Sequence, residues 1–119
     1  MRAVIVVEDE ALVAINLEDM LIELGYEVLG PAMRLEAAMK LVETGASADA
    51  AILDVNLAGA PVFPVAALLA ERGVPIVFAT GYGVAGLPEP WRGHPVLQKP
   101  YTLEEVAAAL AKAVAGGGA

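Results

Sequence analysis

Side chains that together suit phosphoryl chemistry stand at four points along the chain. The acids Glu8-Asp9-Glu10 come near the start, Asp54 near the middle, and Thr80 and Lys99 follow. Crowded carboxylates repel one another unless a cation neutralises them, and oxygen ligands suit a hard ion such as Mg²⁺. A hydroxyl and an ammonium group stabilise the negative charge of a transferring phosphoryl group. A carboxylate beside them, for which Asp54 is best placed, can act as the nucleophile and form an aspartyl phosphate.

Each of these residues also has a simpler interpretation when taken alone. Acids favour the N-terminus of a helix, and we expect Glu10 to have that role rather than to bind a metal. An aspartate at the end of a strand is often a turn residue, and most lysines lie on the surface. The chemical interpretation therefore depends on the fold that brings the four points together.

Apolar runs of strand length alternate with segments of helical period along the chain. The predicted strands are 3–7, 27–30, 50–53, 76–79 and 96–98, and the predicted helices are 11–24, 35–42, 64–71 and 103–115. This alternation predicts an α/β fold, a doubly wound five-stranded parallel sheet of order 2-1-3-4-5, flavodoxin-like in arrangement. Each candidate residue follows a predicted strand, so all should meet at the carboxyl edge of the sheet.

The segment from Gly81 to Pro95 interrupts the alternation where a fourth helix should stand. Its four glycines and three prolines are poor helix formers, so we expect a loop or at most one turn. Residues 81–86 match G-x-G-x-x-G, but no helix follows to hold a pyrophosphate, which argues against a dinucleotide site. The final helix begins with a predicted capping box, Thr102 to Glu105.

Composition limits the class of protein. The chain has 119 residues, 58% of them hydrophobic, no cysteine and a net charge of -8. These features predict one domain over residues 1–115 with a flexible tail at 116–119, located in the cytoplasm. The acidic charge disfavours nucleic acid and anionic membranes as partners.

Four short motifs, in order and at these spacings, resemble those of bacterial response-regulator receiver domains, which are CheY-like. They are Val6-Val-Glu-Asp-Glu10, Leu53-Asp-Val55, Ala79-Thr-Gly81 and Lys99-Pro100. The resemblance implies that Mg²⁺, or Mn²⁺ in its place, is held by Glu8, Asp9, Asp54 and the backbone carbonyl of Asn56. It implies that Thr80 and Lys99 contact the phosphoryl group, and that the Lys99–Pro100 peptide bond is cis.

The resemblance also implies a function in two-component signalling. A histidine kinase or a phosphotransfer protein would donate the phosphoryl group to Asp54, and output would pass through contacts with a downstream protein. The domain would catalyse only its own phosphorylation and dephosphorylation, so it is not expected to be an enzyme acting on other substrates. Roles as a phosphate sink or in a phosphorelay stay open.

A narrower resemblance concerns the switch. Residues 78–82, Phe-Ala-Thr-Gly-Tyr, are similar to the "FAT GUY" subgroup of receivers, often single-domain proteins that pair with HWE-type histidine kinases. The usual aromatic switch residue, three positions before the lysine, is replaced by Val96. We therefore expect Tyr82, with Gly81 and the segment up to Pro90, to carry the switch, and count Val96 and Pro100 as further candidates.

Two other functions and three residue roles stay open at this stage. The chain could be a degenerate receiver that serves only as a binding scaffold, or a flavodoxin-like cofactor module, although Glu8-Asp9-Glu10 would repel a phosphate. Asn56 is either a turn residue or one that tunes access of water to the acyl phosphate. Trp91 is either a partner anchor or a lid on the core, and His94 is expected to be a surface or half-buried residue.

Overall fold

Five parallel strands form the central sheet of the protein, which the computed structural model describes over residues 2–44 and 47–116. The strands are β1 (Ala3–Val7), β2 (Glu27–Ala32), β3 (Ala50–Asp54), β6 (Ile76–Thr80) and β7 (Val96–Gln98). Their order is β2-β1-β3-β6-β7, which is the predicted order 2-1-3-4-5, because β6 and β7 are the fourth and fifth strands of this sheet.

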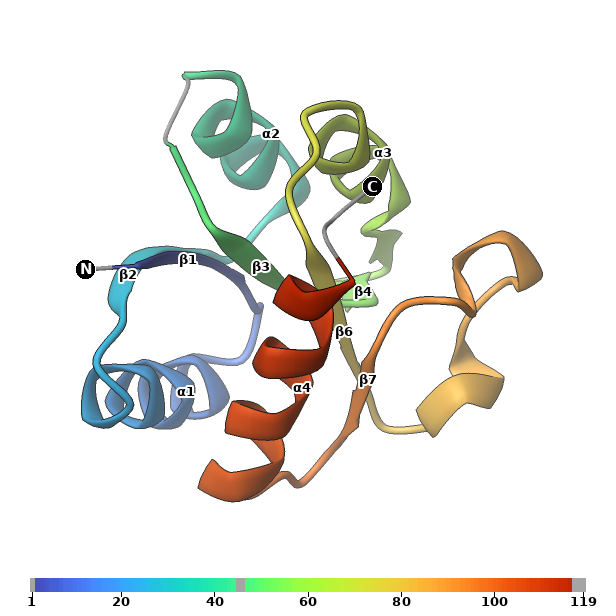
Figure 1. Cartoon of the computed structure of the whole chain (residues 1–119). Helices are drawn as coiled ribbons and strands as arrows, with labels where there is room; N and C mark the ends of the chain where they lie inside the picture. Colours follow the sequence, from blue (N-terminus) through green and yellow to red (C-terminus); the bar gives the residue numbers. More distant parts are fainter. Residues whose placement is uncertain (1, 45–46, 117–119) are drawn as a thin grey trace.

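Four α-helices cover the two faces of the sheet (Figure 1). They are α1 (Ala11–Glu23), α2 (Leu35–Glu43), α3 (Phe63–Glu71) and α4 (Leu103–Ala115). The central strands are buried from end to end, as two-sided coverage of a parallel sheet requires. None of these helices is long and apolar enough to cross a membrane.

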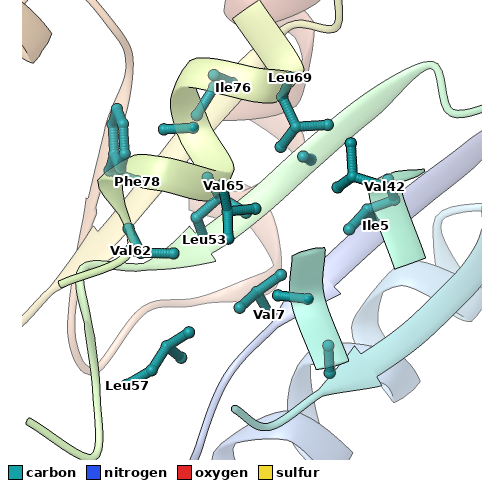
Figure 2. Packing of buried hydrophobic residues seen from close by; sticks show 14 of the residues in the cluster. Ile5, Val7, Val42, Leu53, Leu57, Val62, Val65, Leu69, Ile76 and Phe78 are labelled. Atoms are coloured by element: carbon teal, nitrogen blue, oxygen red, sulfur yellow. The ribbon is translucent and has the colours of Figure 1, made fainter. Parts of the chain in front are cut away.

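Alternate residues of each strand supply two separate cores. Ile5 and Val7 of β1 point toward α2 and α3, where Leu53 and Phe78 join them (Figure 2). Val4 and Val6 point to the opposite face, where α1 and α4 pack. Because each fully buried aliphatic or aromatic side chain stabilises the fold by about 1.5–3 kcal/mol, both faces contribute to fixing the carboxyl edge of the sheet.

Helix α1 buries only part of the face that the sequence predicts. Ala14, Leu17 and Leu21, at spacings of three and four, are buried against the sheet. The helical period of residues 11–24 predicts that Leu12, Ile15 and Ile22 share this face with Leu17, Leu21 and Leu24, but Leu12, Ile15 and Ile22 are exposed. The prediction was wrong because apolar residues occur around most of this helix, and only packing against the sheet selects one side.

Strand β2 runs two residues further than predicted. It continues through Pro31 to Ala32, and the Gly30–Pro31 peptide bond is cis. Proline is compatible with this position because β2 is an edge strand, in which one side of the backbone needs no partner.

A short antiparallel hairpin that the sequence analysis did not predict follows β3. Its strands are β4 (Asn56–Leu57) and β5 (Ala60–Pro61), joined by Ala58 and Gly59. Leu57 is buried in the same core cluster as Val7 and Val62, and this burial anchors the hairpin (Figure 2).

The segment between β6 and β7 contains no α-helix, as predicted, but it has two short 3₁₀ turns rather than one. They are η1 (Gly83–Gly86) and η2 (Glu89–Trp91). The Trp91 ring lies 5.9 Å from Phe63 and 5.8 Å from Phe78, centroid to centroid. Trp91 is therefore packed over the core as a lid, and His94 beside it is half-buried, as expected.

Helix α4 begins at the predicted capping box. The Thr102 hydroxyl accepts a bond from the Glu105 N–H at 3.2 Å, and the Glu105 carboxylate accepts one from the Thr102 N–H at 2.9 Å. This reciprocal pair satisfies two free donors of the first turn. Residues 117–119 of the predicted tail lie outside the described residues.

Candidate functional site

The parallel strands bring the predicted site residues to one edge of the sheet. Glu8 follows β1 directly, Asp54 ends β3, Thr80 ends β6, and Lys99 follows β7. The registers pair Val7 with Leu53, Asp54 with Ala79, and Thr80 with Gln98. These registers place Glu8 level with Asp54, Thr80 one residue beyond that level and Lys99 one residue further, so all four lie at the carboxyl edge of the sheet.

Lys99 joins the acids of two strands. Its ammonium Nζ lies 2.9 Å from Glu8 Oε1 and 3.3 Å from Asp54 Oδ2. Glu8 is only 1% exposed, and its second oxygen, Oε2, accepts a bond from the Glu10 N–H at 3.0 Å. Both oxygens of the buried Glu8 carboxylate are thus paired, as a charge removed from water requires.

The Asp54 carboxyl has a strongly perturbed acidity. Its burial, the neighbouring Asp9 carboxyl and the charge of Glu8 raise the pKa of Asp54 to about 7, although the positive charge of Lys99 opposes them. Glu8 and Asp54 thus share one ammonium group, and Asp9 adds a third carboxyl beside Asp54. A divalent cation among them would favour the ionised form of Asp54.

The surroundings of Asp9 and Lys99, unlike those of Asp54, favour the charged form of each group. Burial alone would raise the pKa of Asp9, but bonds with Asp54 and from the Ala58 N–H outweigh it, and the pKa lies below its ordinary value. Burial alone would lower the pKa of Lys99, but Glu8 and Asp54 together raise it. Asp9 and Lys99 are therefore held in their charged forms.

A cavity of about 370 Å³ opens at this edge between the acids and the hairpin. Asp9, Asp54 and Lys99 line it together with the hairpin residues Asn56 and Ala58. Glu8 does not line the cavity, because it is buried, and it is paired with Lys99. The structure thus brings Asp9, Asp54, Asn56 and Lys99 around one space, which contains hard oxygen donors and one cationic donor.

The Thr80 hydroxyl is bonded to the segment that follows β6. Its Oγ1 accepts a bond from the Tyr82 N–H at 3.1 Å. A Cβ added to Gly86 would lie only 2.7 Å from the same Oγ1, so the η1 turn touches the hydroxyl closely. Thr80 therefore connects the site edge to residues 82–86.

The remaining predicted residues lie around this connection. Tyr82 is 82% exposed. Gly81 is exposed and lines the cavity, and Val96 is half-buried opposite Phe78 on β6. The Lys99–Pro100 peptide bond is cis, as the family resemblance implies.

Asn56 and Glu10 behave mainly as local structural residues. The Asn56 Oδ1 atom accepts a bond from the Gly59 N–H at 2.8 Å, which is the geometry of a turn residue. Glu10 is the N-cap residue of α1, as expected, although its side chain forms no capping bond. Its carboxylate lies within 4.8 Å of those of Glu8 and Asp9.

Two contacts at the site were not found from the sequence. The Ala58 N–H donates to Asp9 Oδ2 at 2.9 Å, and Gly86 abuts the Thr80 hydroxyl. The Ala58-Gly59 pair, between Leu57 and Ala60, was only a weak signal for a turn. Gly86 gave no signal, because six other glycines and prolines surround it in the segment.

Comparison with known proteins extends over nearly the whole chain. SdrG from Sphingomonas melonis Fr1, a solution structure, is 44% identical, with a TM-score of 0.86 over 96% of this chain and 97% of that one. A BeF3-activated conformation of SdrG is 46% identical, with a TM-score of 0.78 over 92% of each chain. The response regulator TrrA from Thermotoga maritima, in complex with Mg²⁺ and BeF, is 26% identical, with a TM-score of 0.80 over 94% of this chain and 98% of that one.

A curated relative agrees with these structures. The transcriptional regulatory protein PdtaR of Mycobacterium tuberculosis is 32% identical over 117 residues. The match covers 95% of this chain but 57% of the relative, so the chain spans little more than half of that protein's length. No family model matches the chain. Together with the sheet order and the acid–lysine edge, these likenesses show that the chain belongs to the response-regulator receiver domains of two-component signalling systems.

Proposed function

We propose that the protein is a phosphoacceptor that takes a phosphoryl group on Asp54 from the phosphohistidine of a histidine kinase or a phosphotransfer protein. One observation supports this above others: the Asp54 carboxylate faces the cavity with Asp9 beside it and Lys99 Nζ 3.3 Å away. An Asp54 oxygen attacks phosphorus while the bond to the donor imidazole breaks. Lys99 offsets the negative charge that the new acyl phosphate carries.

Mg²⁺ fits the proposed site by the chemistry of its donors. Glu8, Asp9, Asp54 and the Asn56 backbone carbonyl offer only hard oxygen atoms, which Mg²⁺ and Mn²⁺ favour. Burial, with Asp9 and Glu8 beside it, raises the pKa of Asp54, and a cation at the site would favour the ionised form of that carboxyl. When bound, the ion would neutralise charge on the phosphoryl oxygens. Coordination by Glu8 requires that it exchange its bond to Lys99 or to the Glu10 N–H.

The switch that we propose runs through Thr80 rather than through an aromatic residue at position 96. When the Thr80 hydroxyl donates to a phosphoryl oxygen on Asp54, its contact with the Tyr82 N–H and with Gly86 changes. The η1 turn then shifts and alters the surface around the exposed Tyr82. The response is a change in the conformation of residues 81–90, which a partner protein reads.

Output passes, in this proposal, through contacts of the receiver with a downstream protein, or through transfer of the phosphoryl group onward to a phosphotransfer histidine. HWE-type histidine kinases are the proposed donors. The net charge of -8 favours a partner with a basic surface and disfavours nucleic acid. A phosphate sink that drains a kinase uses the same chemistry without a downstream target.

Beryllofluoride titration with Mg²⁺, followed by amide chemical shifts, tests the site. We expect shifts at residues flanking Asp54, Thr80 and Lys99 that the Asp54→Asn variant does not show. Phosphotransfer from candidate kinases should label the wild-type protein and not the variant. If the wild-type protein shows neither the shifts nor the label, it is a binding scaffold that has lost phosphorylation, and the proposal is contradicted.

A further inference from the structure

The turn of the β4–β5 hairpin holds an unfavourable backbone conformation beside the acids. Ala58 has φ of 51°, in the left-handed region, and no other non-glycine residue in ranges 2–44 and 47–116 has a positive φ. A side chain with a Cβ is disfavoured there, and such residues persist where the surroundings fix them. The contacts of Ala58 therefore need an explanation.

The conformation directs the Ala58 backbone N–H at a carboxylate 49 residues away in sequence. This N–H donates to Asp9 Oδ2 at 2.9 Å. The next N–H, of Gly59 with φ of 91°, donates to Asn56 Oδ1 at 2.8 Å and remains within the hairpin. Two successive positive φ angles are those of a type I′ turn, and they place these two donors in different environments.

The hairpin that presents the Ala58 N–H is itself anchored. Leu57, its neighbour, is 2% exposed and packs in the core. The Val62 N–H, directly after β5, donates to the Val55 carbonyl at 2.9 Å and closes the base of the hairpin. The donor is thus fixed to the same framework that holds Asp54 at the end of β3.

We infer that the Ala58 backbone N–H is a positioning group for Asp9, which fixes one carboxylate oxygen on the hairpin so that the other is presented to a divalent cation in the cavity. The inference rests on the proposed function, because it concerns the cation of that site. Carboxylates that bind metals are commonly oriented by such outer donors, whose loss weakens metal affinity by about 10–100-fold. Ala58 and Asp9 line the same cavity, as the role requires.

A single-atom substitution tests the role. Ala58→lactic acid, made by introducing the α-hydroxy acid during synthesis of the full chain, replaces the N–H by an ester oxygen and keeps the methyl group. Gly59→glycolic acid is the matched control, because it deletes the neighbouring N–H, which bonds to Asn56 and not to Asp9. Mg²⁺ affinity is measured for both and for the wild type by amide chemical shifts, and folding by thermal unfolding.

We expect the ester at position 58 to weaken Mg²⁺ binding about 10-fold or more, and the ester at 59 to change it by no more than about twofold. Equal losses in the two esters would mean that the hairpin acts only as a structural element, and would overturn the inference. If the wild type and the ester at 58 bind Mg²⁺ with equal affinity, the inference is overturned but the proposed function is not. A wild-type protein that binds no Mg²⁺ would overturn the proposed function as well.

A second measurement needs no ester and so does not depend on the variants folding. Scalar coupling across the hydrogen bond, between the Ala58 ¹⁵N and the Asp9 carboxylate ¹³C, should be present without Mg²⁺ and persist when Mg²⁺ is added. Disappearance of the coupling on addition of Mg²⁺ would contradict a positioning role. Ala58→Gly keeps the N–H and should retain Mg²⁺ affinity within about twofold.

Discussion

The residues at the ends of β1, β3 and β7 are held very differently from the residues that follow β6. Glu8, Asp54 and Lys99 are joined by short ion pairs, and the two acids are almost fully buried. After β6, Tyr82 and Val84 are exposed, Gly81 lines the cavity, and the Tyr82 N–H donates to the Thr80 hydroxyl.

The difference separates chemistry from response. A paired and buried network has little freedom to move, which keeps the reacting groups in place. None of residues 81–86 is buried, and a stretch with few buried contacts opens at low free-energy cost. We therefore expect changes at Lys99 to cost stability and changes after β6 to alter the response, and the predictions below test that division.

Lys99→Met should have the largest effect on stability. It leaves the buried Glu8 and Asp54 carboxylates without their cation, and removal of one partner from a buried pair costs about 3–5 kcal/mol. The measurement is the free energy of unfolding by urea at neutral pH with EDTA present. Lys112→Met, on the exposed face of α4, is the control and should cost no more than about 1 kcal/mol. Similar costs for the two variants would show that the network does not hold the edge together.

Gly86→Ala should have an intermediate effect and act at the contact between the two regions. The new methyl group would lie 2.7 Å from Thr80 Oγ1 and 3.3 Å from Tyr82 Cβ, so one of them must move. Overpacking of this kind costs about 1–3 kcal/mol. Gly81→Ala is the matched control, because its added Cβ meets no atom within 4 Å. Its free energy of unfolding should stay within about 0.5 kcal/mol of the wild-type value. Thermal unfolding distinguishes them, and equal stability would mean that η1 does not press on Thr80.

Tyr82→Ala should leave stability within about 0.5 kcal/mol, because the side chain is exposed. If the segment after β6 carries the switch, the variant should still bind beryllofluoride but show a reduced amide shift response across residues 81–90. Val84→Ala, also exposed in that segment, serves as the comparison. An unchanged response in Tyr82→Ala would remove Tyr82 from the switch.

Protonation of His94, in the segment between β6 and β7, should lower the stability of the protein at acid pH. We expect this effect to be the smallest of the four. Burial lowers the pKa of His94 below its ordinary 6.5, so the unfolded chain binds the proton more readily. The contribution of His94 to stability is therefore full above about pH 6.5, falls as pH drops below that value, and levels off under the folded-state pKa. His94→Phe keeps an aromatic ring against Phe78 and Trp91 but cannot take a proton. The fall in midpoint temperature from pH 7.5 to pH 5 should therefore be smaller in that variant than in the wild type. An equal fall would show that His94 is not the source of the acid effect.

The sequence alone determined the sheet, its strand order and the edge at which the acids, Thr80 and Lys99 meet. Apolar runs with a period of two or of 3.6 are local signals, and the alternation of strands and helices then leaves few ways to wind a parallel sheet. The absence of a fourth helix and the capping box of α4 were also predictable from local signals. Glycine and proline disfavour helix in their own turn, and threonine caps the turn that follows it.

Only the tertiary structure decided which face of α1 is buried, that Lys99 pairs with Glu8 as well as with Asp54, and that Ala58 bonds to Asp9. It also decided that Gly86 abuts the Thr80 hydroxyl. The Lys99 and Ala58 contacts join residues more than 40 positions apart, and the Gly86 contact depends on how an irregular segment folds back on a strand end. Their geometry follows from strand register, side-chain rotamers and close packing, which no window of neighbouring residues encodes.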